Sequence, residues 1–232
     1  MNVKKRLVNI INHVFPQTCA GCNFALSHEN LLCSDCMYSL PITDHHKIPT
    51  NKFTNHFLGR VNIEKGAAYL NFRKDSIVQE LMHKLKYSGK FFIGEVLGKM
   101  AAEEIEKINY LNEIDIIIPV PLHKIKMNIR GYNQCEAFAK GLSSYSNIPY
   151  SNDILLKIKN TSSQTSKSRT QRIENVERSF EVTRVIDLNG KHILLVDDVV
   201  TTGATLESCA LVLQSAYPQI KISMYTIAIA NR

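Results

Sequence analysis

The sequence predicts an α/β protein that combines a doubly wound parallel sheet with a small N-terminal zinc-binding module. Segments typical of strands and of helices alternate from about residue 66 onward, which is the order of a parallel sheet with helices on both faces. The segment Ile114–Val120 is almost continuously apolar, as expected for a strand covered on both faces. Two Cys-x-x-Cys pairs precede this region and indicate the separate module.

The length and composition suit one α/β domain with a small appendage. The chain has 232 residues, of which 44% are hydrophobic, enough for a sizeable core. No apolar run approaches the roughly eighteen residues that a membrane-spanning helix needs, so we expect a cytoplasmic protein without a transmembrane segment. The net charge of +7 favours polyanionic partners. A solvated basic surface, or a site for a highly anionic small molecule, would give the same charge.

The first residues, MNVKKRLVNIINHVF, begin basic and continue apolar. Polar residues interrupt the apolar stretch and no small-residue cleavage site follows, so we interpret the segment as an amphipathic helix rather than a signal peptide. Its apolar face comprises Leu7, Ile10, Ile11 and Val14. We expect this helix to pack on its own protein, with a membrane surface as the alternative.

Four of the six cysteines form one pattern, Cys19-x2-Cys22 and Cys33-x2-Cys36, separated by ten residues. Two such pairs are the usual way to place four thiolates tetrahedrally around structural Zn²⁺. Disulfides and an iron–sulfur cluster are the alternatives. Cys135 and Cys209 fall on the faces of expected helices, where we expect them to pack as small hydrophobic residues.

Further elements follow in order along the chain. We expect residues 1–42 to hold the amphipathic helix and the cysteine module, residues 43–64 to form a polar, irregular linker, and residues 65–232 to form the α/β domain. The expected strands are Gly66–Phe72, Ile114–Val120, the segment that begins at Ile193, and Lys221–Ala230. The expected helices are Ile77–Tyr87, Phe92–Ile108, one through Cys135 and Leu142, and one through Leu206 and Leu213 at helical spacing.

The segment Ile193–Thr205, ILLVDDVVTTGAT, carries the most specific chemistry. An apolar strand leads into Asp197 and Asp198, and a short loop rich in threonine precedes a helix. Helix N-termini bind phosphate, Gly203 lets the backbone approach a ligand, and threonine hydroxyls add donors. Carboxylates at the carboxyl end of a parallel strand can accept hydrogen bonds from two vicinal hydroxyls or hold Mg²⁺. The segment therefore predicts a site for a ribose that carries a 5-phosphate. The simpler alternative is a buried strand that ends in a helix N-cap, which explains only one polar residue.

Three other segments carry polar chemistry. Pro119–Leu122 runs on to Arg130-Gly-Tyr-Asn-Gln, where Lys124 and Arg130 could bind pyrophosphate. Asn133 and Gln134 could cap the next helix or contact a ligand. The segment Leu155–Phe180 is long and rich in Ser, Thr and cations, as in a lid over phosphates or a solvated linker. The segment His83–Lys90 (HKLKYSGK) has basic and aromatic side chains that could stack a base or face nucleic acid.

The segment VDDVVTTGAT resembles the phosphoribosyl-pyrophosphate (PRPP) signature of type I phosphoribosyltransferases. That resemblance implies a parallel α/β sheet with a small hood. It implies that Asp197 and Asp198 contact the ribose diol and its Mg²⁺, and that the loop cradles the 5-phosphate. The implied PRPP-binding residues are Asp197, Asp198, Val199, Val200, Thr201, Thr202, Gly203, Ala204, Thr205, Lys124 and Arg130, with Asp197, Asp198 and Arg130 as the catalytic set.

The motifs together resemble the ComF family of proteins linked to DNA uptake in natural transformation, and its GntX-like relatives. The double Cys-x-x-Cys, HKLKYSGK, IIPVPL with RGYNQ, the spacing of Thr161, Gln164, Arg172 and Asn175, and VDDVVTTGAT occur in the family's order. The resemblance implies a lid around those four spaced residues. It also implies a PRPP-binding accessory factor that handles internalised single-stranded DNA.

Two further hypotheses stay open. An intact donor loop also suits an active phosphoribosyltransferase that transfers ribose 5-phosphate from PRPP to a small nucleophile, such as a base or an amine. Such a site needs little acid–base chemistry from the protein, so binding and turnover look alike in sequence. A structural adaptor that docks a helicase or channel through its zinc module is a third possibility.

Overall fold

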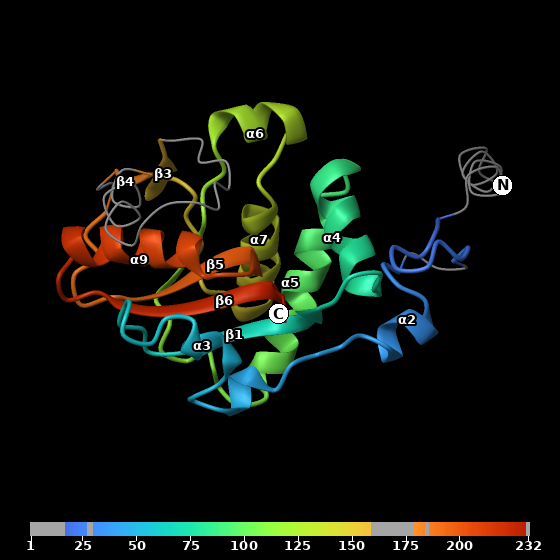
Figure 1. The fold of residues 1–232 in the computed structure, drawn as a ribbon, viewed down its shortest axis with the longest axis horizontal. Helices are drawn as coiled ribbons and strands as arrows, with labels where there is room; N and C mark the ends of the chain where they lie inside the picture. The colour runs from blue at the N-terminus through green and yellow to red at the C-terminus, as the bar shows by residue number, and fades with distance from the viewer. Residues whose placement is uncertain (1–16, 27–29, 159–178, 184–185, 231–232) are drawn as a thin grey trace, which may run out of the picture.

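The computed structural model describes residues 17–26, 30–158, 179–183 and 186–230. A four-stranded sheet in the order β1-β6-β5-β2 lies at the centre of this part of the chain (Figure 1). Its strands are β1 (Gly66–Phe72), β2 (Ile116–Pro119), β5 (His192–Val200) and β6 (Lys221–Ala230). All three neighbouring pairs are parallel, which confirms the predicted parallel sheet.

Three helices cover one face of this sheet. They are α4 (Ile77–Tyr87), α5 (Phe92–Glu106) and α7 (Gln134–Ser146). Their apolar stripes form one core with side chains from alternate strand positions, among them Leu194 and Val196. The helices α5 and α7 approach very closely, because a Cβ at Gly141 would lie 2.1 Å from the Glu95 carbonyl oxygen. Only glycine therefore fits at this crossing.

The other face is covered by α9 (Ala204–Ala216), whose Leu206, Cys209 and Leu213 pack against the intervening strand positions such as Leu195. Helices on both faces confirm the doubly wound arrangement. Figure 1 shows the long β5 and β6 running beside α9. The burial of Cys135 and Cys209 confirms that these two thiols pack in the interior.

The element bounds differ from expectation in three places. Helix α5 ends at Glu106 rather than Ile108, and β2 is shorter than Ile114–Val120. Strand β5 continues to Val200, past the two acids that were expected at its carboxyl end. This extension occurs because β6 continues beside β5, pairing with it as far as Val200 opposite Ile229.

Residues 43–64 are more ordered than the sequence predicted. They contain a 3₁₀ helix η1 (His45–Lys47) and the helical turn α3 (Lys52–Asn55), which begins with a capping box at Asn51. The Asn51 amide donates to the Gly66 carbonyl oxygen at 2.9 Å. Phe53 and Phe57 are fully buried under the α9 face of the sheet. The expectation of an irregular segment was wrong because polar composition concealed these two anchoring aromatic residues.

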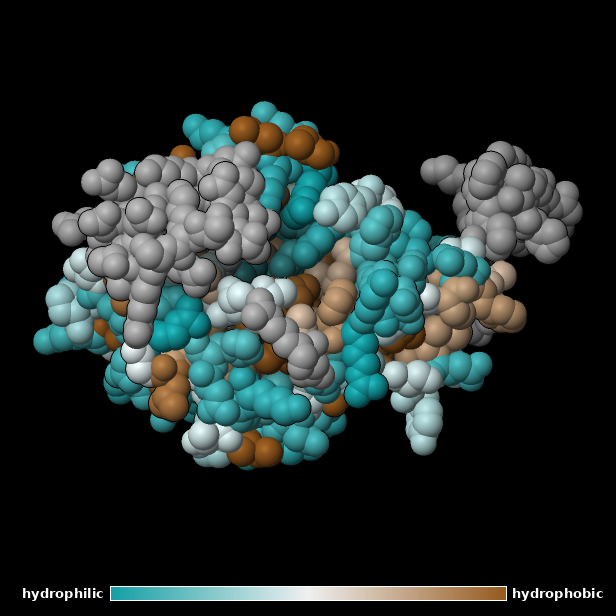
Figure 2. All heavy atoms as spheres, viewed as in Figure 1, coloured by the Kyte–Doolittle hydropathy of each residue, from teal (hydrophilic) through white to brown (hydrophobic). Residues whose placement is uncertain are grey.

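The remaining described elements are short. Helix α2 (Ser34–Tyr38) belongs to the cysteine module, and α6 (Lys124–Arg130) stands at the edge of the domain, where Figure 2 shows apolar side chains and Ile125 and Ile129 are exposed. Strands β3 (Leu155–Lys157) and β4 (Phe180–Val182) form a separate antiparallel pair. The predicted N-terminal helix and the four lid residues lie outside the described residues. In the described part of the chain, no helix is both long enough and apolar enough to cross a membrane.

Candidate functional site

The acid pair lies near the carboxyl end of β5, beyond the end of β2. The register pairs Pro119, the last residue of β2, with Val196, so both acids follow the point where β2 stops. Successive side chains of a strand point to opposite faces. Accordingly, Asp197 Oδ1 accepts a hydrogen bond from the Cys135 thiol at 3.2 Å, whereas Asp198 Oδ2 lies 2.8 Å from Lys86 Nζ. The two carboxylates are adjacent but have different neighbours.

The charges of these groups are coupled. Burial and then the charge of Asp198 raise the pKa of Asp197 to about 6, while the backbone N–H of Asp198 and the Cys135 thiol partly offset this rise. Burial opposes the charge on Lys86, but Asp198 outweighs it, so the pKa of Lys86 is raised. The pKa of Asp197 therefore lies near neutral pH, and Lys86 is charged at neutral pH.

The loop after the acids has the form of an anion site. Asp197 together with residues 199–206 lines one small pocket, which contains every residue of the predicted phosphate loop. Helix α9 has Gly203 as its N-cap, at φ +76°, and this residue has no side chain with which to cap the helix. The N-cap residue is therefore Gly203 and neither Asp198 nor a threonine, although the Thr202 hydroxyl accepts a hydrogen bond from the Ala204 N–H at 3.4 Å. An N-terminus without a side-chain cap presents backbone N–H groups to a ligand.

Arg60 fixes this loop from outside, and sequence reasoning missed it. Its guanidinium donates to the Thr202 carbonyl oxygen at 3.0 Å and to the His56 carbonyl oxygen at 2.7 Å. It also forms a two-pronged ion pair with Glu207, with Nε 3.0 Å from Oε1. Phe57 lies against Gly203 on the same side. No motif in residues 43–64 pointed to the loop, because the contact joins segments over 140 positions apart.

The segment between β2 and α7 contains the helix α6, which was not predicted from the sequence. Lys124 lies exposed in the first turn of α6 and Arg130 in its last turn, about 9 Å apart along the helix axis. Helix α6 thus separates two residues that were expected to share one pyrophosphate. Arg130 Nη1 donates to Gln134 Oε1 at 2.9 Å, and its guanidinium lies over the Tyr87 ring at 5.4 Å.

Gln134 has an unusual environment. It is 1% exposed, and its Nε2 has no hydrogen-bond partner among the described residues. Buried amide donors are normally satisfied, so this N–H group is available to a ligand or a water molecule. Gln134 is also the first residue of α7, which begins after the Asn133 N-cap. Its free donor beside Arg130 adds to the capacity of this corner to hold an anion.

The segment HKLKYSGK contributes directly to the acid pair. Lys86 and Tyr87 form the end of α4, and the Tyr132 hydroxyl donates to the Leu85 carbonyl oxygen, which ties α4 to the segment after α6. Tyr87 also contacts the His83 ring, with 5.2 Å between centroids. The sequence indicated only a basic, aromatic segment. That Lys86 would reach Asp198 depends on how α4 packs on the sheet.

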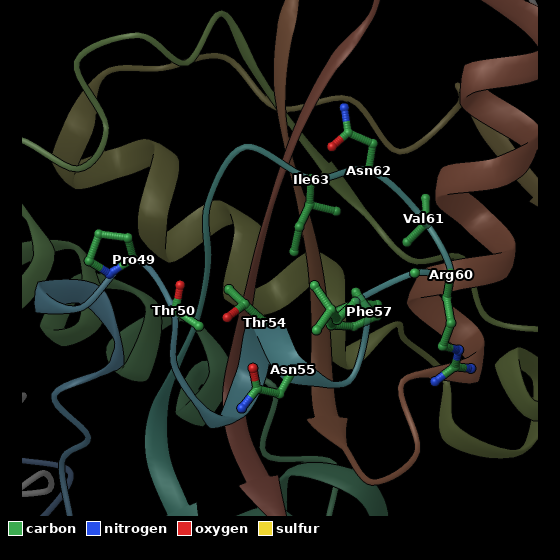
Figure 3. A pocket seen from close by; sticks show the side chains of 11 residues that line it. Pro49, Thr50, Thr54, Asn55, Phe57, Arg60, Val61, Asn62 and Ile63 are labelled. Carbon is green, nitrogen blue, oxygen red and sulfur yellow. The ribbon is translucent and has the colours of Figure 1, made fainter.

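A larger pocket of about 480 Å³ lies beside residues 49–63 (Figure 3). Its lining side chains are mostly apolar or small, and its one charged residue, Arg60, is already engaged by Glu207 and Thr202. This chemistry does not suit a sugar phosphate. The acid pair and the threonine loop remain the stronger candidate site.

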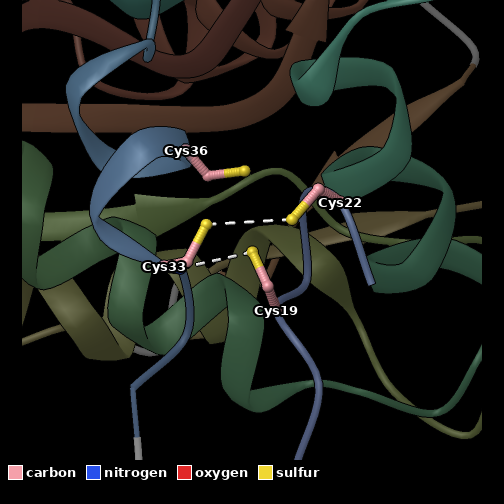
Figure 4. Close-up of side chains that lie close together, drawn as sticks. All are labelled: Cys19, Cys22, Cys33 and Cys36. Carbon is pink, nitrogen blue, oxygen red and sulfur yellow. Dashed lines mark hydrogen bonds between the residues drawn. The ribbon is translucent and has the colours of Figure 1, made fainter. Parts of the chain in front are cut away.

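The four cysteines of the N-terminal module lie together (Figure 4), with their sulfur atoms all within 4.8 Å of one another. The backbone N–H groups of Gly21 and Cys33 donate to Cys19 Sγ at 3.4 and 3.3 Å. Burial disfavours the Cys19 thiolate, but hydrogen bonds from the backbone of Cys22, Cys33 and Gly21 outweigh it and lower the pKa of Cys19 to about 6. Four convergent sulfurs, one of which has its thiolate stabilised by backbone donors, fit a closed metal site.

The module packs on α4. Lys84 Nζ donates to the Ala20 carbonyl oxygen at 2.8 Å and to Asn23 Oδ1 at 2.6 Å. Gly21 lies so close to Ile77, at the start of α4, that a Cβ would approach it to 2.6 Å. Helix α4 therefore contacts the cysteine module through Lys84 and the acid pair through Lys86.

Comparisons with known proteins agree with these features. Residues 131–232 match the family model of the phosphoribosyl transferase domain. The chain is 26% identical over 200 residues to Competence protein F of Haemophilus influenzae, covering 84% of this chain and 78% of that one. It is 26% identical over 195 residues to the DNA utilization protein YhgH of Escherichia coli K12, covering 83% and 82%.

A third relative is Competence protein ComFC of Bacillus subtilis, 28% identical over 153 residues, with 66% of this chain and 60% of that protein covered. The alignments with the first two relatives cover most of both chains. Residues 131–232, which match the family model, contain the acid pair and the threonine loop. The chain is thus similar over most of its length to competence protein F and YhgH, and its residues 131–232 match the phosphoribosyl transferase domain.

Proposed function

We propose that this chain is a PRPP-binding protein that acts in DNA uptake, and that it handles internalised single-stranded DNA in the cytoplasm. The observation that carries the proposal is the order of features at the end of β5. The acid pair is followed by the threonine loop, which lines a pocket, and then by the N-terminus of α9, whose N-cap residue has no side chain. The names of the relatives, competence and DNA utilization proteins, support the role in DNA uptake.

Each part of PRPP has a partner in this proposal. The 5-phosphate lies on the loop Thr201–Thr205, where backbone N–H groups and threonine hydroxyls donate to it. Asp197 and Asp198 accept hydrogen bonds from the ribose hydroxyls. The pyrophosphate is held by Arg130 and by the free amide of Gln134, with the lid residues Thr161, Gln164, Arg172 and Asn175 contributing from the segment between β3 and β4. Lys124 remains a candidate contact if α6 moves toward the ligand.

Two metals belong to the proposal. The four cysteines would hold Zn²⁺, which stabilises the module and supplies no catalytic position, because four thiolates close its coordination sphere. Mg²⁺ would arrive with PRPP and supply charge neutralisation for the pyrophosphate. The carboxylates of Asp197 and Asp198 offer the hard oxygen donors that this ion prefers.

The cysteine module also offers a surface for bases. Tyr38 is 95% exposed and Phe24 is 70% exposed, and both lie within the module. Exposed aromatic rings stack unpaired bases without sequence preference, and the net charge of +7 attracts the phosphate backbone. We propose that these two rings contact single-stranded DNA and leave protein partners, such as a helicase or channel, to other surfaces.

Calorimetric titration tests the binding proposal. Wild-type protein with Mg²⁺ should bind PRPP at one site per chain and bind ribose 5-phosphate more weakly, since the latter lacks the pyrophosphate. Equal affinity for PRPP and ribose 5-phosphate would contradict the proposed contacts to the pyrophosphate. For DNA, replacing Tyr38 and Phe24 with alanine should weaken single-strand binding, and affinity should fall with added salt. Salt-independent binding would contradict the basic-surface role.

An active phosphoribosyltransferase is the second candidate, and the complete acid pair and loop favour it. Such an enzyme would stabilise positive charge on the ribose electrostatically, with the anionic pocket already in place. Incubation with PRPP and a panel of bases and amines would report it. Sustained pyrophosphate release above solvent hydrolysis supports turnover, and release no faster than in buffer supports the binding role.

A further inference from the structure

We propose that a surface beside the sugar-phosphate site stacks unpaired bases of single-stranded DNA. The surface lies where the end of α4 meets the end of α6, and Figure 1 shows these two helices beside each other. We call it the α4–α6 surface, and it consists of the rings of Tyr87 and Phe91 and the cations Lys90, Lys126 and Arg130. The inference rests on the proposed role in DNA handling, and it gives the strand a second contact apart from the cysteine module.

Specific contacts hold the two halves of this surface together. The Arg130 guanidinium lies over the Tyr87 ring at 5.4 Å. The Tyr132 ring, which follows α6, meets the Phe91 ring edge to face, with 6.1 Å between centroids. The Tyr132 hydroxyl also donates to the Leu85 carbonyl oxygen near the end of α4. Rings and cations from two distant segments therefore share one corner of the domain, and their positions are set before a ligand arrives.

Both rings of the α4–α6 surface are open to solvent. Tyr87 is 65% exposed and Phe91 is 51% exposed, although each also contacts a neighbouring side chain. By contrast, Phe138 on α7 and Phe53 on α3 are completely buried, as is usual for phenylalanine. Exposed apolar area that is gathered in one place marks an interaction site. The internal contacts thus account for only part of each ring, and the rest is available to a planar partner.

Positive charge surrounds these rings. The segments that form the surface, residues 81–94 and 116–135, contain lysine and arginine but neither aspartate nor glutamate. Lys90 lies in the loop between α4 and α5, and Lys126 lies one helical turn before Arg130 on the same side of α6. None of these three cations forms an ion pair with a carboxylate among the described residues. Their charge is therefore available to an anionic partner.

This chemistry fits a single strand better than a duplex or a protein. Exposed rings stack unpaired bases, and cations beside them contact the phosphates on either side, whereas a duplex keeps its bases stacked on one another. Protein interfaces also use aromatic rings and arginine, but lysine is depleted in them. Asp198 of the adjoining site is paired with Lys86, which offsets its repulsion of a strand. The combination of rings with lysines therefore favours single-stranded DNA.

The test uses the full chain and two labelled strands of equal length, one of deoxythymidine and one of abasic sites, with affinity measured by fluorescence anisotropy. Phe91→Leu removes the flat ring but keeps apolar volume. It should bind the thymidine strand about tenfold more weakly and the abasic strand as the wild type does, because only the former offers bases to stack. Phe91→Trp should bind both strands as the wild type does. The matched control Tyr145→Leu, a ring 43% exposed at the far end of α7, should leave both affinities unchanged.

Lys126→Gln tests the cations of the surface. It should weaken binding of both strands and lower the slope of log affinity against log salt concentration by about 0.7, as for the loss of one phosphate contact. A slope as steep as that of the wild type would contradict the assignment of Lys126 to the surface.

Wild-type affinity of Phe91→Leu for the thymidine strand would overturn the inference and leave the surface to a protein partner. An equal loss on the thymidine and abasic strands would also overturn it, because such a loss does not involve the bases. If thermal unfolding shows that Phe91→Leu does not fold, Tyr87→Leu replaces it and is judged by the same comparison. A wild-type chain that binds neither strand would instead remove the DNA-handling part of the proposed function.

Discussion

Arg60 and Thr202 are joined by a hydrogen bond of 3.0 Å, in which the guanidinium donates to the Thr202 carbonyl oxygen. The same guanidinium pairs with Glu207 in the first turn of α9. The candidate phosphate loop is thus held at its middle and at the start of the following helix by one side chain. A loop that is fixed before the ligand arrives loses less conformational freedom on binding.

Arg60→Ala should weaken PRPP binding without changing the fold. Loss of the hydrogen bond to Thr202 frees the loop, and one such bond corresponds to about a fivefold change in affinity. Calorimetry against the surface control Lys107→Ala measures the effect. Unchanged affinity in Arg60→Ala would show that the loop keeps its shape without this contact.

Gly203→Ala should impair both folding and binding. The residue has φ +76°, which disfavours a side chain, and an added Cβ would lie 3.0 Å from the Phe57 ring. The two causes predict a loss of about 1–2 kcal/mol in the free energy of unfolding. Urea unfolding measures it, and a second substitution separates the causes: Phe57→Leu should recover part of the loss if the ring contact dominates. A Gly203→Ala variant as stable as wild type would contradict the strained conformation.

Asp197→Asn should raise stability while lowering ligand affinity. The pKa of Asp197 is raised from 3.8 to about 6, so the folded state binds more protons than the unfolded state between these values. The free energy of unfolding therefore falls as pH rises through this window, and above pH 6 the charged form carries the full cost. Asparagine avoids it, which predicts a gain of about 1–2 kcal/mol at pH 7.5 and little difference below pH 4.

Asp115→Asn is the matched control with the opposite sign. The Asp115 carboxylate accepts from the His192 N–H at 2.8 Å and from Lys191 at 3.1 Å, which lowers its pKa. Its ionised form is therefore the stabilising one, and its neutral replacement should unfold more easily at pH 7.5. Thermal unfolding across pH 4–8 compares the variants. A loss of stability in Asp197→Asn at pH 7.5 would contradict the described environment of that carboxylate.

The cysteine module should contain one metal ion per chain. Replacing Cys33 and Cys36 together with serine should abolish metal binding, because only two of the four sulfurs remain. Elemental analysis measures the metal, and Cys209→Ala, a buried cysteine on α9, serves as the control that should retain it. Four oxidised thiols in the metal-free wild type, or full metal content in the double variant, would contradict the assignment.

The sequence predicted most of the central fold because its elements carry strong local patterns. The bounds of β1, α4 and β6 were predicted correctly, since Gly66–Phe72, Ile77–Tyr87 and Lys221–Ala230 are clearly bounded apolar or periodic segments. Helix α6 was missed. None of its seven side chains is buried, so the sequence contains no apolar face that would indicate a helix there.

The candidate site was only partly predictable for a similar reason. The loop and both acids are contiguous in sequence, so their chemistry could be recognised directly. Lys86 and Arg60 reach them from 112 and more than 140 positions away, and such contacts depend on how helices pack on the sheet. The Cys135 contact to Asp197 was equally hidden, because a buried thiol has the pattern of a small hydrophobic residue.

The most direct test of the central claim is calorimetric titration of PRPP with Mg²⁺ into the double variant Asp197→Asn, Asp198→Asn. Asp115→Asn, at the amino end of β2 and β5, serves as the control. We predict that the wild type and Asp115→Asn bind at one site per chain and that the double variant shows no measurable binding. A double variant that is folded and binds PRPP with wild-type affinity would contradict the assignment of the ribose to this acid pair.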